Sequence, residues 1–326
     1  MSPPRVFIDG HAGTTGLRIR DWLADRSDLD VWTLPEADRK SDEARRRAVA
    51  EADLTVLCLP DDAARAAAAW ADEAGARLID ASSSHRVADG WTYGLPELAK
   101  DQRDAIREAR RVTNPGCYAS AFVALVRPLV DAGRVARDAA LAVHGLSGYS
   151  GGGKSLIARW ESPDEGRVGL PYEAPYALER VHKHLPEMQT YGRLAQPPHF
   201  VPAVGAFRCG MRVEVPIHAS LLRGAEPRGG EGDPGEGVWQ TLVDRYRGEP
   251  FVGVAPYRGL EPVDDFTLDP TQLNDTNRME IHVIPNPAGH VLLVALLDNL
   301  GKGAAGVAIQ NLNLMLGLDE TTGLPA

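Results

Sequence analysis

Short apolar runs alternate with helix-like segments over the first hundred residues. The apolar runs predict four strands, at residues 5–9, 29–34, 54–59 and 77–80. The segments between them predict helices, at residues 14–24, 36–51 and 61–75. Strands that alternate with helices are typical of a parallel sheet covered by helices on both faces.

The middle of the chain has a different pattern. Longer strand candidates stand between long loops and few clear helices, at residues 139–145, 207–222, 279–285 and 290–297. They predict a second, α+β domain with a larger mixed sheet. The Gly-, Pro- and acid-rich stretch 224–237 predicts a flexible surface loop. The apolar segment 303–316 predicts a buried helix that returns to the first domain.

Composition narrows the class of protein. The 326 residues include 35 Lys and Arg against 45 Asp and Glu, a net charge of -10, with 44% apolar and 25% charged residues. These values are typical of a globular protein of about two domains. The acidic balance argues against a nucleic-acid binder but allows an anionic substrate, because a pocket sets its own local field. The longest apolar run, residues 291–297, is too short to cross a bilayer, which needs about 20 residues.

The chain ends and the cysteines indicate a compartment. The N-terminus leads almost directly into a strand, so we expect no signal peptide and no membrane association. Cys58, Cys117 and Cys209 are too few and too scattered for a disulfide framework or a zinc site, and we expect no metal. These features favour a reducing cytoplasm.

Three glycines follow the first strand, with the spacing G-x-x-G-x-x-G. Gly10, Gly13 and Gly16, with Thr14 and Thr15 between them, connect this strand to the first helix. Small residues let the backbone approach a pyrophosphate, and the helix start supplies unpaired N–H groups. The placement therefore predicts a dinucleotide-binding turn, although an ordinary tight turn between strand and helix has the same pattern.

Two cations after the second strand bear on cofactor choice. Arg39 and Lys40 stand where an enzyme that binds NAD would place a carboxylate, so they favour the 2′-phosphate of NADP. The alternative is that they merely begin a charged surface helix. Ser82, just beyond the strand at 77–80, is a further candidate for cofactor binding.

Cys117 is the strongest candidate nucleophile. It follows the turn Asn114-Pro-Gly and starts an apolar helix over residues 118–130. A helix start lowers the pKa of a thiol and makes it nucleophilic near neutral pH. N–H groups between Asn114 and Tyr118 could hold an oxyanion. A nucleophilic cysteine beside a nicotinamide site suggests acyl transfer followed by hydride transfer; Cys58 and Cys209 lie in apolar strands and are expected to be inert.

The sequence of four segments resembles one enzyme family. NPGCYAS, FIDGHAGTTG, HKHLPEM and DNLGKGAAGVAIQNLN are similar to the N-acetyl-gamma-glutamyl-phosphate reductases of arginine biosynthesis, in the shorter of their two sequence types. The resemblance extends from residue 6 to about residue 318. The related aspartate-semialdehyde dehydrogenases share the architecture but differ around the cysteine.

The resemblance implies a reaction. N-acetyl-L-glutamyl 5-phosphate would be reduced by NADPH to N-acetyl-L-glutamate 5-semialdehyde with release of phosphate, although a related acyl phosphate stays possible. Cys117 matches the nucleophile, and His184 matches the acid/base that protonates the thiohemiacetal oxygen. Tyr176 and His182 match the family's neighbours of that histidine. Asn299, with Lys302 and Gly303, matches the C-terminal segment by which the family's chain returns to the cofactor.

The resemblance also implies an architecture and an assembly. We expect an α/β fold with a Rossmann-like NADP-binding domain at residues 1–115 plus 300–326. An α+β catalytic and dimerisation domain would be inserted at residues 116–299. The family is implied to form a homodimer or homotetramer.

A second motif competes with this interpretation. Gly148-Tyr-Ser-Gly-Gly-Gly-Lys154-Ser155 satisfies the P-loop pattern G-x-x-x-x-G-K-[ST] and follows a strand candidate. A P-loop nucleotide hydrolase is therefore one alternative, and a non-catalytic NADP-binding redox sensor is another. In the preferred interpretation the glycine loop lines the substrate pocket, and Lys154 neutralises the substrate phosphate. Arg208 and Arg212, spaced to share one face of a strand, are further candidates for binding substrate anions, although solvated surface charge explains all three equally well.

Overall fold

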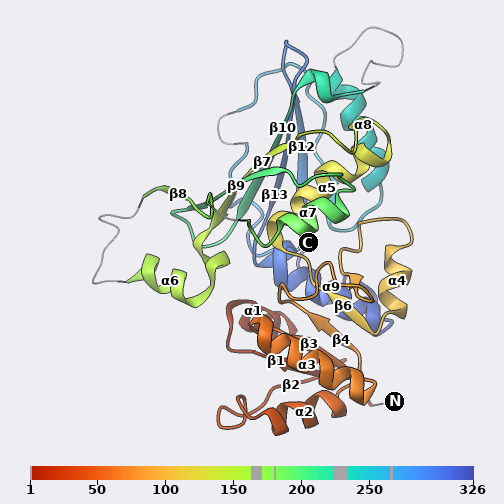
Figure 1. Ribbon diagram of the computed structural model, residues 1–326, viewed down its shortest axis with the longest axis vertical. Coiled ribbons are helices and arrows are strands. Elements are labelled where there is room, and N and C mark those ends of the chain that lie inside the picture. Colours follow the sequence, from red (N-terminus) through yellow and green to blue (C-terminus); the bar gives the residue numbers. More distant parts are fainter. Residues whose placement is uncertain (1, 163–170, 180, 224–233, 265–266) are drawn as a thin grey trace. The chain divides into compact units, whose positions relative to one another are not determined.

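The computed structural model describes residues 2–162, 171–179, 181–223, 234–264 and 267–326 (Figure 1). The chain divides into two compact units. The first unit contains Met1–Pro115 and Ala304–Pro325, and the second contains Gly116–Gly303 together with Ala326.

The first unit is built on a six-stranded sheet in the order β2-β1-β3-β4-β6-β5. Every neighbouring pair of strands is parallel. The strands are β1 (Arg5–Asp9), β2 (Asp30–Trp32), β3 (Leu54–Leu57), β4 (Leu78–Asp80), β5 (Thr92–Tyr93) and β6 (Arg111–Thr113). The predicted parallel sheet is confirmed.

Helices cover both faces of this sheet. Successive side chains of a buried strand point to opposite faces, so each face presents apolar side chains that a helix must cover. Val6 and Ile8 pack in the core that contains residues of α1 (Thr14–Leu23), α4 (Gln102–Glu108) and α9 (Gly306–Met315). Phe7, between them in β1, packs in the core that contains residues of α2 (Asp42–Glu51) and α3 (Asp61–Ala74). Helix α9 comes from the far end of the chain, so the first unit needs both ends of the sequence to complete its core.

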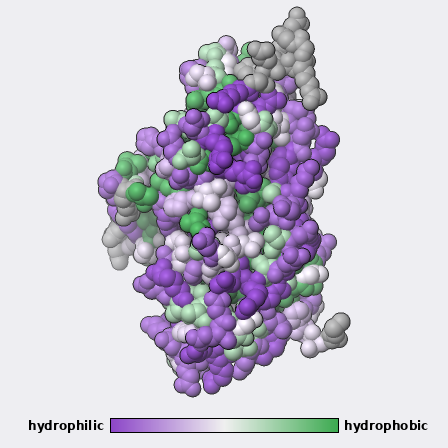
Figure 2. All heavy atoms as spheres, turned by 45° about the vertical axis from the view of Figure 1, so that its right-hand side comes forward, coloured by the Kyte–Doolittle hydropathy of each residue, from purple (hydrophilic) through white to green (hydrophobic). Residues whose placement is uncertain are grey.

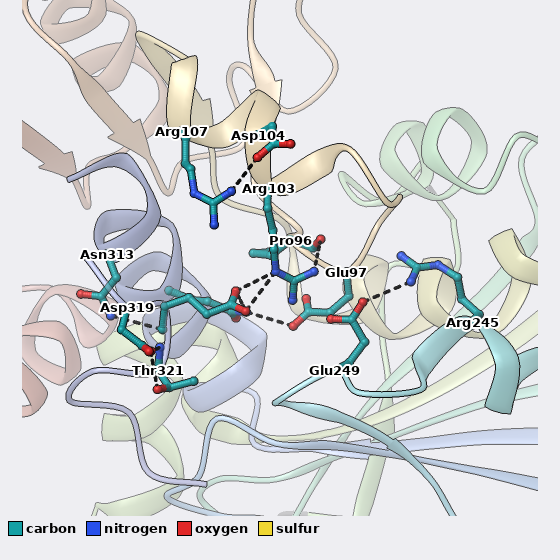
Figure 3. Close-up of polar contacts among 12 residues, drawn as sticks. Pro96, Glu97, Arg103, Asp104, Arg107, Arg245, Glu249, Asn313, Asp319 and Thr321 are labelled. Carbon is teal, nitrogen blue, oxygen red and sulfur yellow. Dashed lines mark hydrogen bonds and ion pairs between the residues drawn. The ribbon is translucent and has the colours of Figure 1, made fainter. Parts of the chain in front are cut away.

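Polar side chains hold α9 in this unit. Gln310 is fully buried and donates hydrogen bonds to Glu97 at 3.0 Å and to Glu320 at 3.2 Å. Arg103 of α4 donates through Nε to both carboxylate oxygens of Glu320 at 3.0 Å, and through Nη1 to the Pro96 carbonyl at 3.3 Å (Figure 3). Hydrogen bonds to charged groups are among the strong ones, so these contacts fix the C-terminal segment against α4.

The second unit is built on a seven-stranded mixed sheet in the order β11-β12-β13-β10-β7-β9-β8. The four central strands from β12 to β7 are antiparallel to their neighbours within that group, whereas β11 and β9 pair in parallel with β12 and β7. The strands are β7 (Ala142–Gly148), β8 (Glu173–Pro175), β9 (His199–Gly205), β10 (Met211–Ile217), β11 (Val252–Val254), β12 (Met279–Pro285) and β13 (Val291–Leu297). The predicted mixed sheet is confirmed.

Three helices cover one face of the mixed sheet: α5 (Cys117–Asp131), α7 (Leu185–Tyr191) and α8 (Pro234–Tyr246) (Figure 1). In β10 every odd-numbered side chain from Met211 to Ile217 is buried. Even-numbered side chains in the same strand are half-buried or exposed, so they point to the opposite face. Helix α5 is buried along almost its whole length, from Tyr118 to Val130, and forms the centre of the helical layer.

Several predicted boundaries are wrong. Strand β10 covers only Met211–Ile217 of the predicted 207–222, because a 3-10 turn follows at Ala219–Leu221. Helix α2 begins at Asp42 rather than at residue 36, because Ser41 caps it by accepting a hydrogen bond from the Ala44 N–H. Of the predicted surface loop 224–237, residues 224–233 lie outside the described residues, and residues 234–237 begin helix α8 instead.

The predicted C-terminal helix has an irregular start. A π-helical turn at Gly301–Ala305 precedes α9, so the segment predicted as one helix over 303–316 consists of two parts. Such turns within helices occur frequently at functional sites.

Figure 2 shows a surface on which hydrophobic residues form small groups among hydrophilic ones. Within the described residues, no helix is long and apolar enough to cross a membrane.

Candidate functional site

The glycine turn of the first unit has room only for glycine at two positions. Gly10 has a φ of 86°, and a Cβ atom there would lie 2.3 Å from the Cys58 carbonyl oxygen. A Cβ atom at Gly16 would lie 2.7 Å from the Gly10 carbonyl oxygen. Gly13 closes the turn by donating its N–H to that same carbonyl at 3.0 Å. The turn is therefore as tight as a dinucleotide-binding turn must be.

The start of α1 fits a phosphate. Gly13 is the N-cap residue, no side chain caps the helix, and its first turn contains no acidic residue. The Thr14 hydroxyl is buried there, and no residue in the described part of the chain gives it a hydrogen bond. A helix start with unfilled donors and an unsatisfied hydroxyl is suited to phosphate oxygens. Thr15 lies in the same first turn.

A buried ion pair between Asp9 and Arg45 lies next to this turn. Asp9, the last residue of β1, accepts hydrogen bonds from Nε of Arg45 in α2, at 3.3 Å on Oδ1 and 3.0 Å on Oδ2, and Nη2 lies 3.0 Å from Oδ2 as an ion pair. Burial raises the pKa of Asp9, and the Arg45 guanidinium acts against that rise. The Arg45 guanidinium therefore offsets the charge of Asp9 beside an anion bound at Gly10–Gly16, a contact that the sequence did not predict.

The other cofactor candidates of the first unit occupy two loops. Arg39 is half-buried and its Nε lies 2.6 Å from Glu36, while Lys40 is exposed; both precede the Ser41 cap of α2. Ser82 is buried after β4, and its N–H and hydroxyl both donate to the Asp80 carboxylate, at 2.8 and 2.7 Å. The Ser82 hydroxyl therefore shapes its own loop.

Cys117 is the first residue of α5, as predicted, and it is half-buried. Gly116 is the N-cap residue, and the first turn of the helix has no acidic residue. A Cβ atom at Gly303 would lie 2.8 Å from the Cys117 Cβ, so the π-helical turn passes close against the cysteine. This half-buried thiol is placed at the positive end of a long buried helix.

Asn114, predicted as a supporting residue, is bonded within the first unit. Its N–H donates to the Asp80 carbonyl at 2.7 Å, and its Nδ2 donates to the Ala304 carbonyl at 2.9 Å. Its side-chain oxygen accepts a long hydrogen bond from Asn311 at 3.5 Å. The backbone N–H of Asn114 is therefore occupied and does not serve as an oxyanion donor.

Both predicted histidines gather around Tyr118, the neighbour of Cys117. The rings of His184 and His182 lie 5.8 and 6.1 Å from the Tyr118 ring, measured between centroids, and 4.7 Å from each other. The Tyr118 hydroxyl donates to the Ala203 carbonyl at 3.0 Å, and burial raises the pKa of Tyr118 well above its usual value. His184 caps the start of α7, and both histidines are buried.

The hydrogen bonds of His182 define its tautomer. The His184 N–H donates to His182 Nδ1 at 3.2 Å, so Nδ1 carries no proton. The ring proton of neutral His182 is therefore on Nε2, which lies 3.4 Å from the Tyr176 hydroxyl. Tyr176, His182 and His184 therefore form one connected chain, and their roles in catalysis stay predictions.

The first three N–H groups of the glycine loop after β7 are already used within the fold. A P-loop needs backbone N–H groups that point at its ligand. Here the N–H groups of Gly148, Tyr149 and Ser150 donate to carbonyls of Gly210, Phe207 and Arg208, at 2.9 to 3.0 Å. Asn299 reinforces this connection, since it accepts from the Gly210 N–H at 2.8 Å and donates to the Ser150 hydroxyl at 3.0 Å. The Asn299 side chain thus has a structural role, and its predicted contact with cofactor stays a prediction.

The three candidate anion-binding cations do not form a group. Lys154 is exposed on α6 (Gly153–Glu161), and Arg208 is exposed and pairs with Glu161 at 2.8 Å. Arg212 pairs with Glu214 at 2.8 Å on the half-exposed face of β10. The prediction that Arg208 and Arg212 share a strand face is wrong, because β10 begins at Met211 and Arg208 lies in the preceding turn.

One buried carboxylate beside Cys117 was not among the site residues predicted from the sequence. Glu187 is 1% exposed and accepts a hydrogen bond from the Gly116 N–H at 2.9 Å. Its place three residues after the N-cap His184 is a sequence signal, because Glu at that position commonly takes part in helix capping. Within the described residues, no group of three or more His, Cys, Asp or Glu side chains could hold a metal ion.

Two family models match this chain. The model described as semialdehyde dehydrogenase, NAD binding domain, matches residues 32–109, and the model described as semialdehyde dehydrogenase, dimerisation domain, matches residues 117–299. Among solved structures, aspartate semialdehyde dehydrogenase II of Vibrio cholerae, complexed with ASA, has a TM-score of 0.71 at 16% identity and covers 97% of this chain and 99% of its own. The enzyme of Candida albicans with NADP has a TM-score of 0.63 at 16% identity, with coverage of 97% and 99%. These structures show the fold.

The curated relatives are much closer in sequence. N-acetyl-gamma-glutamyl-phosphate reductase 2 of Nostoc is 43% identical over 329 aligned positions, which cover 99% of this chain and 100% of the relative. The protein of the same name from Pseudomonas putida is 45% identical, with coverage of 99% and 100%. With such identity over whole chains, the protein belongs to the N-acetyl-gamma-glutamyl-phosphate reductase family.

Proposed function

We propose that this protein catalyses the NADPH-dependent reduction of N-acetyl-L-glutamyl 5-phosphate to N-acetyl-L-glutamate 5-semialdehyde, with release of phosphate, in arginine biosynthesis. The names of its relatives supply the reaction. The observation that carries the proposal is the position of Cys117, half-buried at the first turn of α5 beside the cluster of Tyr118, His182 and His184.

Cys117 forms the covalent intermediate in this proposal. Its thiolate attacks the carbonyl carbon of the acyl phosphate, and the carbon–oxygen bond to phosphate breaks to leave a thioester. The negative charge on the carbonyl oxygen is stabilised by N–H groups of the first turn of α5, which have no acceptor within the helix. Such preorganised donors stabilise the transition state more than the ground state.

His184 donates and accepts the proton of the thiohemiacetal oxygen in this proposal. When bound, the reduced nicotinamide supplies a hydride. The thiohemiacetal oxygen on Cys117 then takes a proton from His184, which recovers it as the carbon–sulfur bond breaks and the aldehyde leaves. His182 and Tyr176 orient His184 through the hydrogen bond from the His184 N–H to His182. General acid–base catalysis of this kind typically contributes about 10²- to 10⁴-fold in rate.

We assign the cofactor to the first unit. The glycine turn at Gly10–Gly16, with Thr14 and Thr15 at the start of α1, would hold the pyrophosphate, and Ser82 borders the same strand ends. Arg39 and Lys40 would select NADP, because both cations follow β2 and a 2′-phosphate adds negative charge there. In this proposal residues 1–115 plus 300–326 form the domain that binds the cofactor, and residues 116–299 form the domain that binds the substrate.

The substrate phosphate requires a cation, and Lys154, Arg208 and Arg212 remain the candidates. Arg208 and Lys154 are exposed, so each could reorient toward a ligand at little cost, whereas Arg212 is already bonded to Glu214 and to the Leu268 carbonyl. We place the reaction in the cytoplasm, where a catalytic thiol stays reduced.

The mixed sheet provides a surface for a homodimer. Pro216, Leu292 and Ile284 form an apolar row across β10, β13 and β12. Leu292 and Ile284 in this row are only partly buried, against the cluster of Leu273, Val294 and Leu296. The family model for residues 117–299 is described as a dimerisation domain. We propose that a second copy of the chain covers this row.

The test of the reaction is a phosphate-dependent assay of NADP+ reduction with N-acetylglutamate semialdehyde. We expect Cys117→Ser to lower kcat by at least about 10³-fold, because a hydroxyl is a far weaker nucleophile than a thiolate. The variant should still bind NADPH, measured by fluorescence, because the cofactor residues lie in the first unit. Turnover by Cys117→Ser at the wild-type rate would remove the covalent mechanism, and equal kcat/KM with NADH would remove the assignment of Arg39 and Lys40.

A further inference from the structure

The carboxylate of Glu187 makes an unusual connection between two helix starts. Glu187 lies in the first turn of α7, whose N-cap residue is His184. Its Oε2 accepts a hydrogen bond from the N–H of Gly116, which is the N-cap residue of α5. The two groups are 71 residues apart in sequence and both are buried. One hydrogen bond therefore links the helix that begins with Cys117 to the helix that begins after His184.

The local sequence explains why Glu187 is available for this contact. A glutamate three residues after an N-cap commonly turns back to the N-cap N–H of its own helix. In α7 that N–H, on His184, donates to His182 Nδ1 instead. The Glu187 carboxylate is thereby released from its usual partner and reaches the start of α5.

This contact limits which groups can stabilise an oxyanion at Cys117. The Gly116 N–H is occupied by Glu187, the Asn114 N–H by the Asp80 carbonyl, and Pro115 has no N–H. Donors to an oxyanion would therefore come from the first turn of α5, because a helix start leaves its first N–H groups without intrahelical acceptors. Glu187 also brings a carboxylate to the helix end where positive potential favours a thiolate.

We propose that Glu187 is a positioning residue for the reaction, which orients Cys117 with respect to His184 through its hydrogen bond to Gly116. The inference rests on the proposed role of Cys117. The titratable groups around the start of α5 include Tyr118, Tyr176, His182, His184 and Glu187. The segment that packs on Cys117 adds the buried Asp298 and Lys302, so Glu187 is one of two carboxylates in this region. Its removal should therefore change both the geometry and the charge at the thiol.

Three variants separate these two effects. Glu187→Ala removes both the hydrogen-bond acceptor and the charge. Glu187→Gln keeps an oxygen acceptor without the charge. Glu187→Asp keeps the charge, but its shorter side chain moves the carboxylate away from the Gly116 N–H. We expect Glu187→Ala and Glu187→Asp to lower kcat by about 10- to 100-fold with KM changed less than about threefold, since misplaced reacting groups cost rate rather than binding. Glu187→Gln should restore kcat to within about fivefold of wild type.

The charge has its own readout, which does not require turnover. The rate of alkylation of Cys117 by iodoacetamide, measured by mass spectrometry of its peptide across pH, reports the ionisation of the thiol. In Glu187→Gln the midpoint should move to lower pH by about half a unit to one unit, because a like charge near the thiolate is gone. Glu249→Gln is the matched control, since Glu249 pairs with Arg245 elsewhere in the second unit, and it should leave the midpoint unchanged.

The outcomes are distinct. Equal loss of kcat in Glu187→Ala and Glu187→Gln, or no loss in either together with an unchanged alkylation midpoint, would overturn the inference. If Glu187→Ala fails to fold, by circular dichroism, the comparison of Glu187→Gln with Glu187→Asp decides in the same way. Loss of activity in Cys117→Ser with normal Glu187 variants would refute only this inference, whereas normal turnover by Cys117→Ser would refute the proposed function itself.

Discussion

At the scale of single residues, Cys58 and Cys117 have opposite environments. Cys58 follows β3, and burial raises the pKa of its thiol to about 12, with the charges of Asp80 and Asp9 adding to the rise. Cys117 lies half-buried at the start of a helix, where the potential favours a thiolate. Iodoacetamide reacts with the thiolate form of cysteine. The reactivity of each cysteine therefore depends on how far its environment favours the thiolate.

We therefore expect iodoacetamide to modify Cys117 at least about 100-fold faster than Cys58 at pH 8, measured by mass spectrometry of the two peptides. The raised pKa gives the pH dependence its sign: in the folded protein Cys58 stays protonated until the pH approaches about 12, so labelling of Cys58 should remain slow at pH 9 to 10. Fast labelling of Cys58 at pH 8, with the fold intact by circular dichroism, would contradict this environment.

Much of the site at this scale was predictable from the sequence, and the reason is local. Cys117 and the glycines at 10, 13 and 16 act through the turns in which they lie, so a strand, a turn and a helix in order were enough to identify them. Glu187 could not be placed, because its partner Gly116 lies 71 residues away and only the tertiary fold brings them together. The same limit applied to the glycine loop, whose first three N–H groups, at residues 148–150, bond to the segment at 207–210.

At the scale of elements, the π-helical turn at Gly301–Ala305 packs tightly on the start of α5. A Cβ atom at Gly303 would lie 2.8 Å from the Cys117 Cβ and 3.1 Å from the Asp298 carbonyl oxygen. The first distance is shorter than side chains tolerate, and backbone lies on the other side. An added methyl group must therefore displace the cysteine, the turn, or both.

We expect Gly303→Ala to lower kcat by about 10²-fold, because a small displacement of a reacting group is costly, while NADPH binding falls much less. Steady-state kinetics and cofactor fluorescence measure the two effects. Gly253→Ala is the matched control, since a Cβ atom there would have no heavy atom within 4 Å. Wild-type kcat in a folded Gly303→Ala variant would show that the turn yields without moving Cys117.

Elements were predicted best where one local rule dominates. Strands β1 and β12 were found with correct boundaries because their apolar runs end at glycine- or proline-rich turns. Helix α8 was missed because its first residues belong to a stretch rich in Gly, Pro and acids, although the later residues bury Val238 and Leu242 against the core. Short strands such as β5, with two residues, depend on a neighbour for pairing and carry no pattern of their own.

At the scale of the whole molecule, the half-exposed face of the mixed sheet is the surface that a second copy would cover. The row of Pro216, Leu292 and Ile284, near one end of these three strands, is apolar. The next row places Glu214 and His282 on either side of Val294, and Glu214 also accepts from His144 at 3.0 Å. An apolar row with polar side chains along one side resembles the core and rim of a symmetric interface, in which the same patch meets itself.

Leu292→Asp should therefore dissociate the assembly. A charge at the centre of an apolar interface costs at least about 2 kcal/mol of binding, or about a 30-fold rise in the dissociation constant, because the carboxylate loses water without gaining a partner. Light scattering coupled to size-exclusion chromatography at micromolar concentration should show a smaller particle, with an unchanged circular dichroism spectrum. Val87→Asp is the control, since Val87 is 45% exposed in the first unit, away from the mixed sheet, and the substitution should leave the particle mass as in wild type. If Leu292→Asp folds and keeps the wild-type mass, the second copy binds elsewhere, and the apolar row needs another explanation.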